Sequence, residues 1–405
     1  MNKTRFLAIA ITLIISSCFN LLQAQYDCSS GRFLQEVFTN PTITSNVTYG
    51  SSSPVSGGTQ SLELDVFEPQ GDTMQRRPLI VFAHGGSFMF GNKTSADIVT
   101  LCNKYTRLGY VTATINYRLG FEGFLPNANT ATETVYRATA DMRAAIRYFR
   151  KDASTNNTFK IDTNNIYAAG VSAGAFIALH LAYLDQVSEI PAAVNPNDFG
   201  GIEGNSGNPG YSSKVKAIVN LCGAIGDTSW IQPGDVPCLS MHGTMDNVVP
   251  YGSAVINVLG IPLFEVDGSS SVATRQNNIG LQNQFVTWNN APHTPFVSST
   301  LYMDSVFQYM TPFLADQLGC DLPVSIETTS QNQTIEVFPN PANSTVFIKS
   351  STAIRLVELF NLQGGLMLSS SSNKLDISEF PAGIYFVRIT TKNQSVVSKR
   401  LVVTK

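Results

Sequence analysis

A serine between two glycines stands at a strand-to-helix junction, and this junction constrains the fold more than any other feature. Residues 165–169 have the β-branched and aromatic composition of a buried strand, and residues 175–183 form an apolar helical run. Between them lies Gly170-Val171-Ser172-Ala173-Gly174. A Cβ at either glycine would collide with the neighbouring strand or helix, and the serine hydroxyl would stand above the sheet. The pattern predicts a nucleophile elbow rather than a glycine-lined turn with a surface serine.

The segments around this junction alternate between strand and helix patterns up to about residue 318, which predicts an α/β fold with a doubly wound, mostly parallel sheet. Residues 61–67 alternate as an edge strand should, and residues 78–83 form the continuous apolar run of a central strand. Further strands are predicted over 110–117, 215–221, 237–241 and 284–288, and helices over 96–108, 132–150 and 305–318. Residues 187–214 are rich in Gly, Asn, Pro and Ser, so we expect a short irregular insertion and an open site.

A serine hydroxyl is a poor nucleophile until a base takes its proton. The chain has four histidines. His293 follows the last predicted strand of the sheet, and a loop at that carboxyl edge can bring an imidazole over Ser172. We therefore expect His293 to be the base. The other three are expected to have structural roles: His84, His180 and His242.

The imidazole needs a carboxylate that fixes its tautomer and stabilises its charged form. Asp246 lies on the loop after the penultimate predicted strand, and the chain order Ser172, Asp246, His293 is that of the α/β hydrolases. Asp227 is the fallback acid, and Asp267 is less favoured. The reaction also needs backbone N–H donors for an oxyanion. We expect one from Ala173 and others from the glycine-containing loop at residues 84–88.

Residues from about 60 to 318 resemble an α/β hydrolase, similar to the carboxylesterases and hormone-sensitive-lipase-like esterases. The resemblance is carried by His84-Gly85-Gly86-Ser87-Phe88, Asn116-Tyr117-Arg118-Leu119-Gly120, Asp141 with Ala144-Ala145-Ile146, Gly170 to Gly174, Asp246 and His293. It implies oxyanion donation from Gly86 and Ser87. The family loop is usually His-Gly-Gly-Gly, so Ser87 is a departure. Val171 is another, because these esterases commonly have an acidic residue before the nucleophile.

The expected activity is hydrolysis of carboxylic esters through an acyl-enzyme, with no cofactor and no metal. Phe88 and Trp230 are candidate substrate-binding residues, although each is as well suited to a core position. Candidate substrates are bulky esters, such as acetylated or feruloylated polysaccharides, lipids or polyesters. Two alternatives stay open: a serine peptidase of the same fold, and a non-catalytic binding protein on a hydrolase scaffold. No Lys and Arg cluster suggests a nucleic-acid partner.

Residues 1–24 have the pattern of a signal peptide, with Lys3 and Arg5 before an apolar run that is too short for a comfortable membrane span. A lipobox reading that ends at Cys18 is the less favoured alternative. No transmembrane span is expected in the mature chain. Export permits disulfides, and the five remaining cysteines allow at most two. Cys222 and Cys238 are expected to lie too far apart to bond.

The catalytic domain is expected over residues 25–320, followed by a polar linker over 321–334 and a small all-β sandwich over 335–405. The last 75 residues carry eight Lys and Arg against four Asp and Glu, in a chain whose formal charge is −3. This tail resembles a type A sorting domain of the type IX secretion system. The matching segments are 337–342, 359–364, 375–378, 381–389 and 399–403. The resemblance implies a Bacteroidetes-type route to the cell surface or exterior, with the secretion machinery as partner. A carbohydrate-binding or adhesive β-sandwich is the alternative.

Overall fold

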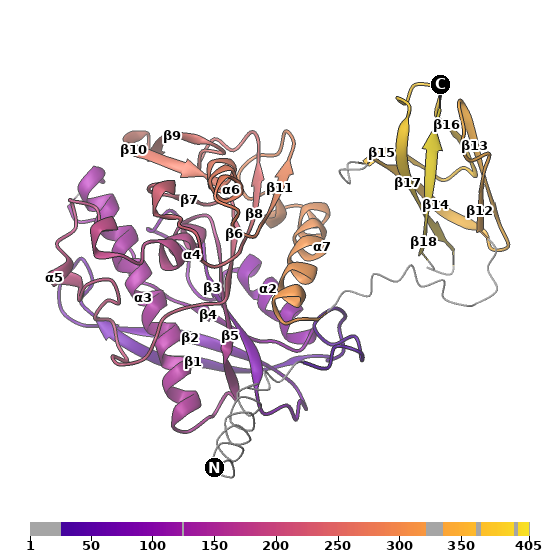
Figure 1. Ribbon diagram of the computed structural model, residues 1–405. Helices are drawn as coiled ribbons and strands as arrows, with labels where there is room; N and C mark the ends of the chain where they lie inside the picture. The colour runs from indigo at the N-terminus through magenta and orange to yellow at the C-terminus, as the bar shows by residue number, and fades with distance from the viewer. Residues whose placement is uncertain (1–25, 124, 321–334, 362–365, 393–395, 405) are drawn as a thin grey trace, which may run out of the picture. The chain divides into compact units, whose positions relative to one another are not determined.

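The structure, a computed structural model, describes residues 26–123, 125–320, 335–361, 366–392 and 396–404. The chain divides into two compact units, Met1–Leu322 and Pro323–Lys405 (Figure 1). The expected signal peptide, Cys18 and the expected linker lie outside the described residues. Among the helices that are described, none has the length and apolar character needed to cross a membrane.

An eight-stranded sheet forms the centre of the first unit, in the order β1-β2-β4-β3-β5-β6-β8-β11. The pairs β1–β2 and β2–β4 are antiparallel, and every other neighbouring pair is parallel, which confirms the expected mostly parallel sheet. The strands are β1 (Pro41–Ser52), β2 (Gln60–Pro69), β3 (Arg77–Ala83), β4 (Val111–Ile115), β5 (Ile161–Val171), β6 (Ala217–Leu221), β8 (Cys238–Gly243) and β11 (Asn283–Trp288).

Helices cover both faces of this sheet (Figure 1). The described helices of this unit are α2 (Ala96–Arg107), α3 (Ala128–Ser154), α4 (Ala173–Tyr183), α5 (Pro196–Phe199), α6 (Ser269–Asn278) and α7 (Thr300–Gln317), with 3₁₀ turns η1 (Val187–Glu189), η2 (Thr228–Trp230) and η3 (Pro295–Val297). Alternate side chains of β3 enter two separate cores: Val81 packs with α3 and α4, whereas Ile80 and Phe82 pack with α2 and α7. Both faces of the central strand are therefore buried, as a continuous apolar run requires.

The sequence-based expectation for residues 61–67 is wrong, because β2 lies between β1 and β4 and is not an edge strand. The edge is β1, which sequence analysis missed. Most of its residues are exposed and polar, so it has no apolar period. A second small sheet, β7 (Ala224–Ile225), β10 (Ile261–Gly268) and β9 (Ser253–Val258), was also not predicted. Its hairpin turns at Leu259 and Gly260, both with positive φ, and leucine is an unusual residue at such a turn position.

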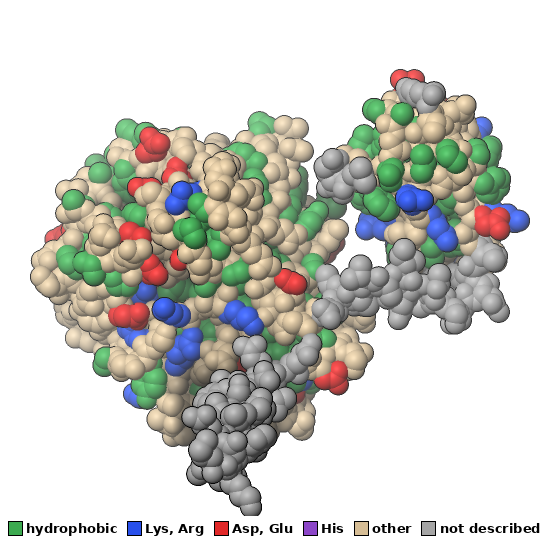
Figure 2. All heavy atoms as spheres, in the orientation of Figure 1, with side chains coloured by type: hydrophobic (Ala, Val, Ile, Leu, Met, Phe, Trp, Pro, Cys, Tyr) green, Lys and Arg blue, Asp and Glu red, His purple; other side chains and the backbone are tan. Residues whose placement is uncertain are grey.

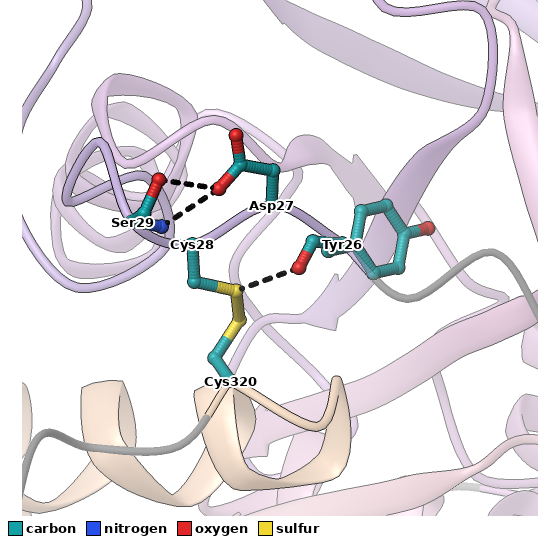
Figure 3. Close-up of a disulfide and its surroundings, with 5 residues drawn as sticks. All are labelled: Tyr26, Asp27, Cys28, Ser29 and Cys320. Atoms are coloured by element: carbon teal, nitrogen blue, oxygen red, sulfur yellow. Dashed lines mark hydrogen bonds between the residues drawn. A yellow bond between two sulfur atoms is a disulfide. The ribbon is translucent and has the colours of Figure 1, made fainter.

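A disulfide joins Cys28 to Cys320, and so ties the segment before β1 to the end of α7 (Figure 3). Beside it, the Asp27 carboxylate accepts hydrogen bonds from the amide and hydroxyl of Ser29. The other described cysteines are buried and free, namely Cys102, Cys222 and Cys238. The expectation that Cys222 and Cys238 do not bond to each other is confirmed.

The second unit is a sandwich of two antiparallel sheets, in the orders β12-β13-β16 and β15-β14-β17-β18. Its core combines Val346 and Ile348 of the first sheet with Val357 and Val387 of the second, which confirms the expected small all-β sandwich. The strands are β12 (Ile335–Phe338), β13 (Thr345–Ser350), β14 (Ile354–Phe360), β15 (Leu366–Ser370), β16 (Lys374–Asp376), β17 (Gly383–Thr391) and β18 (Val396–Val403). Lys and Arg outnumber Asp and Glu on its face in Figure 2.

Candidate active site

Ser172 lies between β5 and α4 in a strained backbone conformation, with φ 54° and ψ −117°. A Cβ at Gly170 would lie 2.0 Å from the Gly174 carbonyl oxygen. A Cβ at Gly174 would lie 2.0 Å from the carbonyl oxygen of Ala83 at the end of β3. The predicted need for glycine at both positions is confirmed, because the helix starts in direct contact with the sheet.

The structure brings the three predicted catalytic residues together at the carboxyl ends of β5, β8 and β11. The Ser172 hydroxyl lies 2.9 Å from His293 Nε2. On the other side of the imidazole ring, His293 Nδ1 lies 2.6 Å from Asp246 Oδ2. This geometry fits a neutral imidazole that donates from Nδ1 to the carboxylate and accepts the serine proton at Nε2. The three residues are separated by 47 to 121 positions in the chain, so only the fold produces the arrangement.

A second histidine, His242, contacts the same carboxylate. Its Nε2 lies 3.0 Å from Asp246 Oδ2, and its Nδ1 lies 2.7 Å from the Ser269 hydroxyl. The amides of Val248 and Val249 each donate to Asp246 Oδ1 at 2.9 Å. Sequence analysis gave His242 only a structural role. His242 stands four residues before Asp246, near the end of a predicted strand, and this spacing could have predicted the contact.

These partners control the charge of Asp246, whose side chain is fully buried. Burial alone raises the pKa of a carboxyl group. The hydrogen bonds from His242 and His293, together with the charge interaction with His293, outweigh burial and hold the pKa of Asp246 well below its usual value. The carboxylate is therefore ionised at neutral pH, which is the state that can stabilise an imidazolium.

The remaining histidines lie outside this group. Burial lowers the pKa of His84, whose Nδ1 donates to the Gly85 carbonyl oxygen and whose ring stacks on Tyr117 with centroids 4.3 Å apart. His180 donates from Nδ1 to the Phe176 carbonyl oxygen at 2.7 Å, and burial lowers its pKa to about 4. Both histidines are therefore neutral at pH 7.

The fallback carboxylates have other partners. Asp227 accepts a hydrogen bond from the Ser229 amide at the start of η2. Asp267 accepts hydrogen bonds from Thr228 and Ser253, at the small β7-β10-β9 sheet. The geometry therefore favours Asp246 as the partner of His293.

The loop after β3 has an unusual backbone conformation at the residues predicted to form the oxyanion site. Gly86, Ser87 and Phe88 have φ values of 120°, 53° and 59°. A Cβ at Gly86 would lie 2.1 Å from the Phe90 carbonyl oxygen, so glycine is required there. Among the turn and loop backbone hydrogen bonds of the described residues, none has the amide of Gly86 or Ser87 as its donor. Ala173 is the first residue of α4, a position whose amide has no partner within the helix. These amides are thus available to a substrate oxygen, and their role remains a prediction.

The two predicted substrate-binding residues lie at different cavities. Phe88 lines a small pocket of about 50 Å³ that also contains Ser172, Ser87 and Ala173. Trp230 lines a separate cavity of about 410 Å³. Strands β9 and β10 supply five residues of the small pocket's wall, so this hairpin covers the nucleophile. The sequence predicted only a short irregular insertion over residues 187–214, and part of that segment lines the larger cavity.

One group of potential metal ligands lies at the same place. Single ligand atoms of Cys222, Asp246 and His293 lie within 4.8 Å of one another. Burial raises the pKa of the Cys222 thiol to about 12, so this side chain is a neutral thiol rather than the thiolate that binds metals. Asp246 and His293 are already hydrogen-bonded to each other. The donor set therefore fits a metal poorly, and the absence of a metal cofactor stays a prediction.

Comparison with known proteins divides the chain in the same way as the fold. Residues 64–230 match the family model BD-FAE, and residues 336–404 match the secretion system C-terminal sorting domain. The first match lies within the α/β unit, and the second covers nearly all of the all-β unit. Gut esterase 1 of Caenorhabditis briggsae is 30% identical over 119 residues, which are 29% of this chain and 20% of that protein.

A second curated relative is matched over a similarly short stretch. Probable carboxylesterase 2 of Arabidopsis thaliana is 31% identical over 116 residues, which are 28% of this chain and 34% of that protein. The chain therefore spans only about a fifth to a third of the length of the curated relatives it matches. Among solved structures, Thermogutta terrifontis esterase 2 phosphorylated by paraoxon aligns with a TM-score of 0.50 at 20% identity. The alignment covers 71% of this chain and 97% of that one, and it shows a shared fold.

Proposed function

We propose that this protein is an exported serine hydrolase that cleaves carboxylic esters. The observation that carries the proposal is the continuous hydrogen-bonded chain from the Ser172 hydroxyl through His293 to the buried Asp246 carboxylate. The match to BD-FAE and the likeness to carboxylesterases support ester chemistry. The sorting-domain match supports a route to the cell surface or exterior through the type IX secretion machinery.

In the proposed first half-reaction, His293 Nε2 takes the proton of Ser172 as its oxygen attacks the ester carbonyl carbon. The carbonyl oxygen becomes an oxyanion, which the amides of Gly86, Ser87 and Ala173 stabilise. Asp246 stabilises the imidazolium that forms on His293. The tetrahedral intermediate then collapses, the bond to the alcohol oxygen breaks, and His293 returns the proton to the leaving alcohol.

The second half-reaction repeats these steps with water. His293 takes a proton from a water molecule, whose oxygen attacks the acyl group on Ser172. Collapse of this intermediate breaks the bond to the serine oxygen, which regains a proton from His293. The carboxylic acid is released, and the site returns to its starting state without a cofactor.

An ester fits the site better than a peptide. The pocket beside Ser172 is small and mainly apolar, with Phe88, Phe176 and Phe264 in its wall. It lacks the volume for a bulky acyl side chain and, among its described lining residues, has no charged group to anchor a peptide terminus. The complete Ser172–His293–Asp246 geometry also disfavours a non-catalytic scaffold, since binding alone does not require an oriented base.

Hydrolysis of p-nitrophenyl acetate by the purified full chain tests the proposal, with p-nitrophenyl butyrate and peptide anilides as comparison substrates. We expect acetate hydrolysis that is lost in Ser172→Ala and stopped by paraoxon, with mass spectrometry locating the phosphoryl group on Ser172. A matched control is Ser229→Ala, a serine outside the site. Cleavage of anilides but not esters would support the peptidase alternative, and esterase activity that survives Ser172→Ala would refute the mechanism.

A further inference from the structure

Two cavities of very different size lie on either side of one aromatic side chain. The pocket that contains Ser172 has a volume of about 50 Å³, and the neighbouring cavity has about 410 Å³. The larger volume is within the usual range of about 300–1,000 Å³ for ligand sites, whereas the smaller one is far below it. The volume directly available to a group attached to Ser172 is therefore much smaller than the volume of the neighbouring cavity.

Three side chains line both cavities: Val135 of α3, Phe176 of α4 and Phe264 of β10. Phe176 has the central position. Its ring contacts Phe88, a residue of the small pocket, edge to face with centroids 6.3 Å apart. The same ring lies nearly parallel to the ring of His180, a residue of the larger cavity, with centroids 6.2 Å apart. Phe176 is only 4% exposed, so its ring fills the partition between the two spaces.

The small pocket lies on the acyl side of the proposed reaction. It is lined by Ser172 together with Ser87 and Ala173, two of the residues whose amides are proposed to stabilise the oxyanion. The acyl carbon is bonded to Ser172 in the intermediate, so its substituent must lie beside these groups. The leaving alcohol must lie near His293, which gives it a proton, and His293 is not among the described residues that line this pocket.

The larger cavity offers apolar surface directly behind the partition. Tyr136, Leu184 and Val194 form an apolar cluster there, with Trp230 packed against it. Val135 continues this surface from the partition itself. A hydrocarbon chain that passed Phe176 would therefore find apolar contacts, although His180 and Arg143 also line the cavity.

We infer that Phe176 determines acyl-chain length in this protein: it restricts the wild-type site to short acyl groups, and its removal opens the 410 Å³ cavity to longer ones. The inference rests on the proposed esterase function. It places the bulk of a natural substrate on the alcohol side, next to His293, and only a short acyl group beside Ser172.

The test compares kcat/KM for p-nitrophenyl acetate and p-nitrophenyl hexanoate in the full chain. Wild type should prefer acetate by at least about tenfold, since one methylene that fits or fails to fit a hydrophobic pocket changes the rate by about 10–200-fold. Phe176→Ala should raise the hexanoate-to-acetate ratio by about tenfold or more, and Phe176→Leu should raise it less. The matched control is Ile190→Ala, which enlarges the larger cavity without opening the partition and should leave the ratio unchanged.

Circular dichroism and thermal melting establish which variants are folded, and Phe176→Leu is included because truncation to alanine removes the most packing. A ratio within twofold of wild type in a folded Phe176 variant that still hydrolyses acetate overturns this inference alone. So does a wild-type enzyme that cleaves hexanoate as well as acetate, a result that needs no variant. Absence of all Ser172-dependent ester hydrolysis overturns the proposed function, and this inference with it.

Discussion

Asp141 and Asp246 are two carboxylates of the first unit whose side chains are both fully buried, but they have different kinds of hydrogen-bond partners. Asp141 of α3 accepts hydrogen bonds from the Arg118 guanidinium and backbone amide and from the Ser206 hydroxyl. Asp246 accepts from two imidazoles, His242 and His293, and from two backbone amides. Both sites satisfy the rule that a buried charge must be paired and hydrogen-bonded.

The difference lies in whether the partner can change its charge. Arginine stays protonated under all ordinary conditions, so the Asp141 site is a fixed ion pair. That pair connects the end of β4, helix α3 and the insertion that contains Ser206. An imidazole can accept a proton at one nitrogen while it donates a hydrogen bond from the other, which the proposed role of His293 requires. Under that proposal, a buried and hydrogen-bonded carboxylate holds the scaffold at Asp141 and supports proton transfer at Asp246.

The largest expected effect is on activity, from Asp246→Asn. The amide would favour the wrong His293 tautomer, and we expect kcat for p-nitrophenyl acetate to fall by about 10⁴-fold, the size of loss known for this change in a serine protease triad. The matched change Asp141→Asn should alter kcat of the folded enzyme far less. Equal losses of kcat in the two folded variants would contradict the proposed division of roles.

The next effect is on stability, from Asp141→Asn. This substitution leaves the Arg118 guanidinium buried without its counter-charge, and breaking such a pair costs about 3–5 kcal/mol. Urea unfolding of wild type and variant measures the change. Glu36→Gln is the control, because Glu36 pairs with Lys104 and Arg107 at the surface, where ion pairs contribute about 0–1 kcal/mol. A similar loss in both variants would show that burial of the pair is not what matters.

A smaller effect is expected at His242. Replacement by Leu removes one hydrogen bond to the charged Asp246, and such a bond is worth about 1.5–3 kcal/mol. If the Asp246 carboxylate shifts as a result, we expect kcat to fall by roughly 10–150-fold, the rate equivalent of that energy. His242→Gln keeps a side-chain donor and should recover part of the loss in kcat. If the role of His242 were only packing, Leu and Gln would leave kcat unchanged, or would lower it together with thermal stability.

The smallest effect is a change in acid sensitivity. The pKa of Asp246 is lowered on folding, so its contribution to stability is fully present above the unfolded pKa of about 3.9 and is lost as the pH falls toward the folded value. Asp246→Asn removes this term. The free energy of unfolding should then fall less steeply below about pH 4 in the variant than in wild type. Urea titrations at several pH values measure the two slopes, and identical slopes would contradict the expected role.

Periodicity and glycine placement were enough to predict β3 to β6, α2 to α4 and the elbow at Ser172, because these segments carry their burial pattern in their own residues. The same reasoning missed β1, whose side chains are mostly exposed, and the β9–β10 hairpin, whose turn contains Leu259. The loops after β8 and β11 were enough to predict that Asp246 and His293 lie beside Ser172, whereas their catalytic roles stay predictions. Sequence analysis did not find the contact of His242 with Asp246, because the strand pattern gives the position of a histidine but not the direction of its ring.

The sequence by itself determined the elbow, the chain order of Ser172, Asp246 and His293 on three loops, and the division into an α/β unit and an all-β tail. Local pattern controls these features, since strand, helix and turn preferences act over a few residues. Only the tertiary structure decided the partners of Asp141 and Asp246, the disulfide between Cys28 and Cys320, and the place of Phe176 between two cavities. Each of these depends on side chains from distant segments, whose packing and burial are set only when the whole domain has folded.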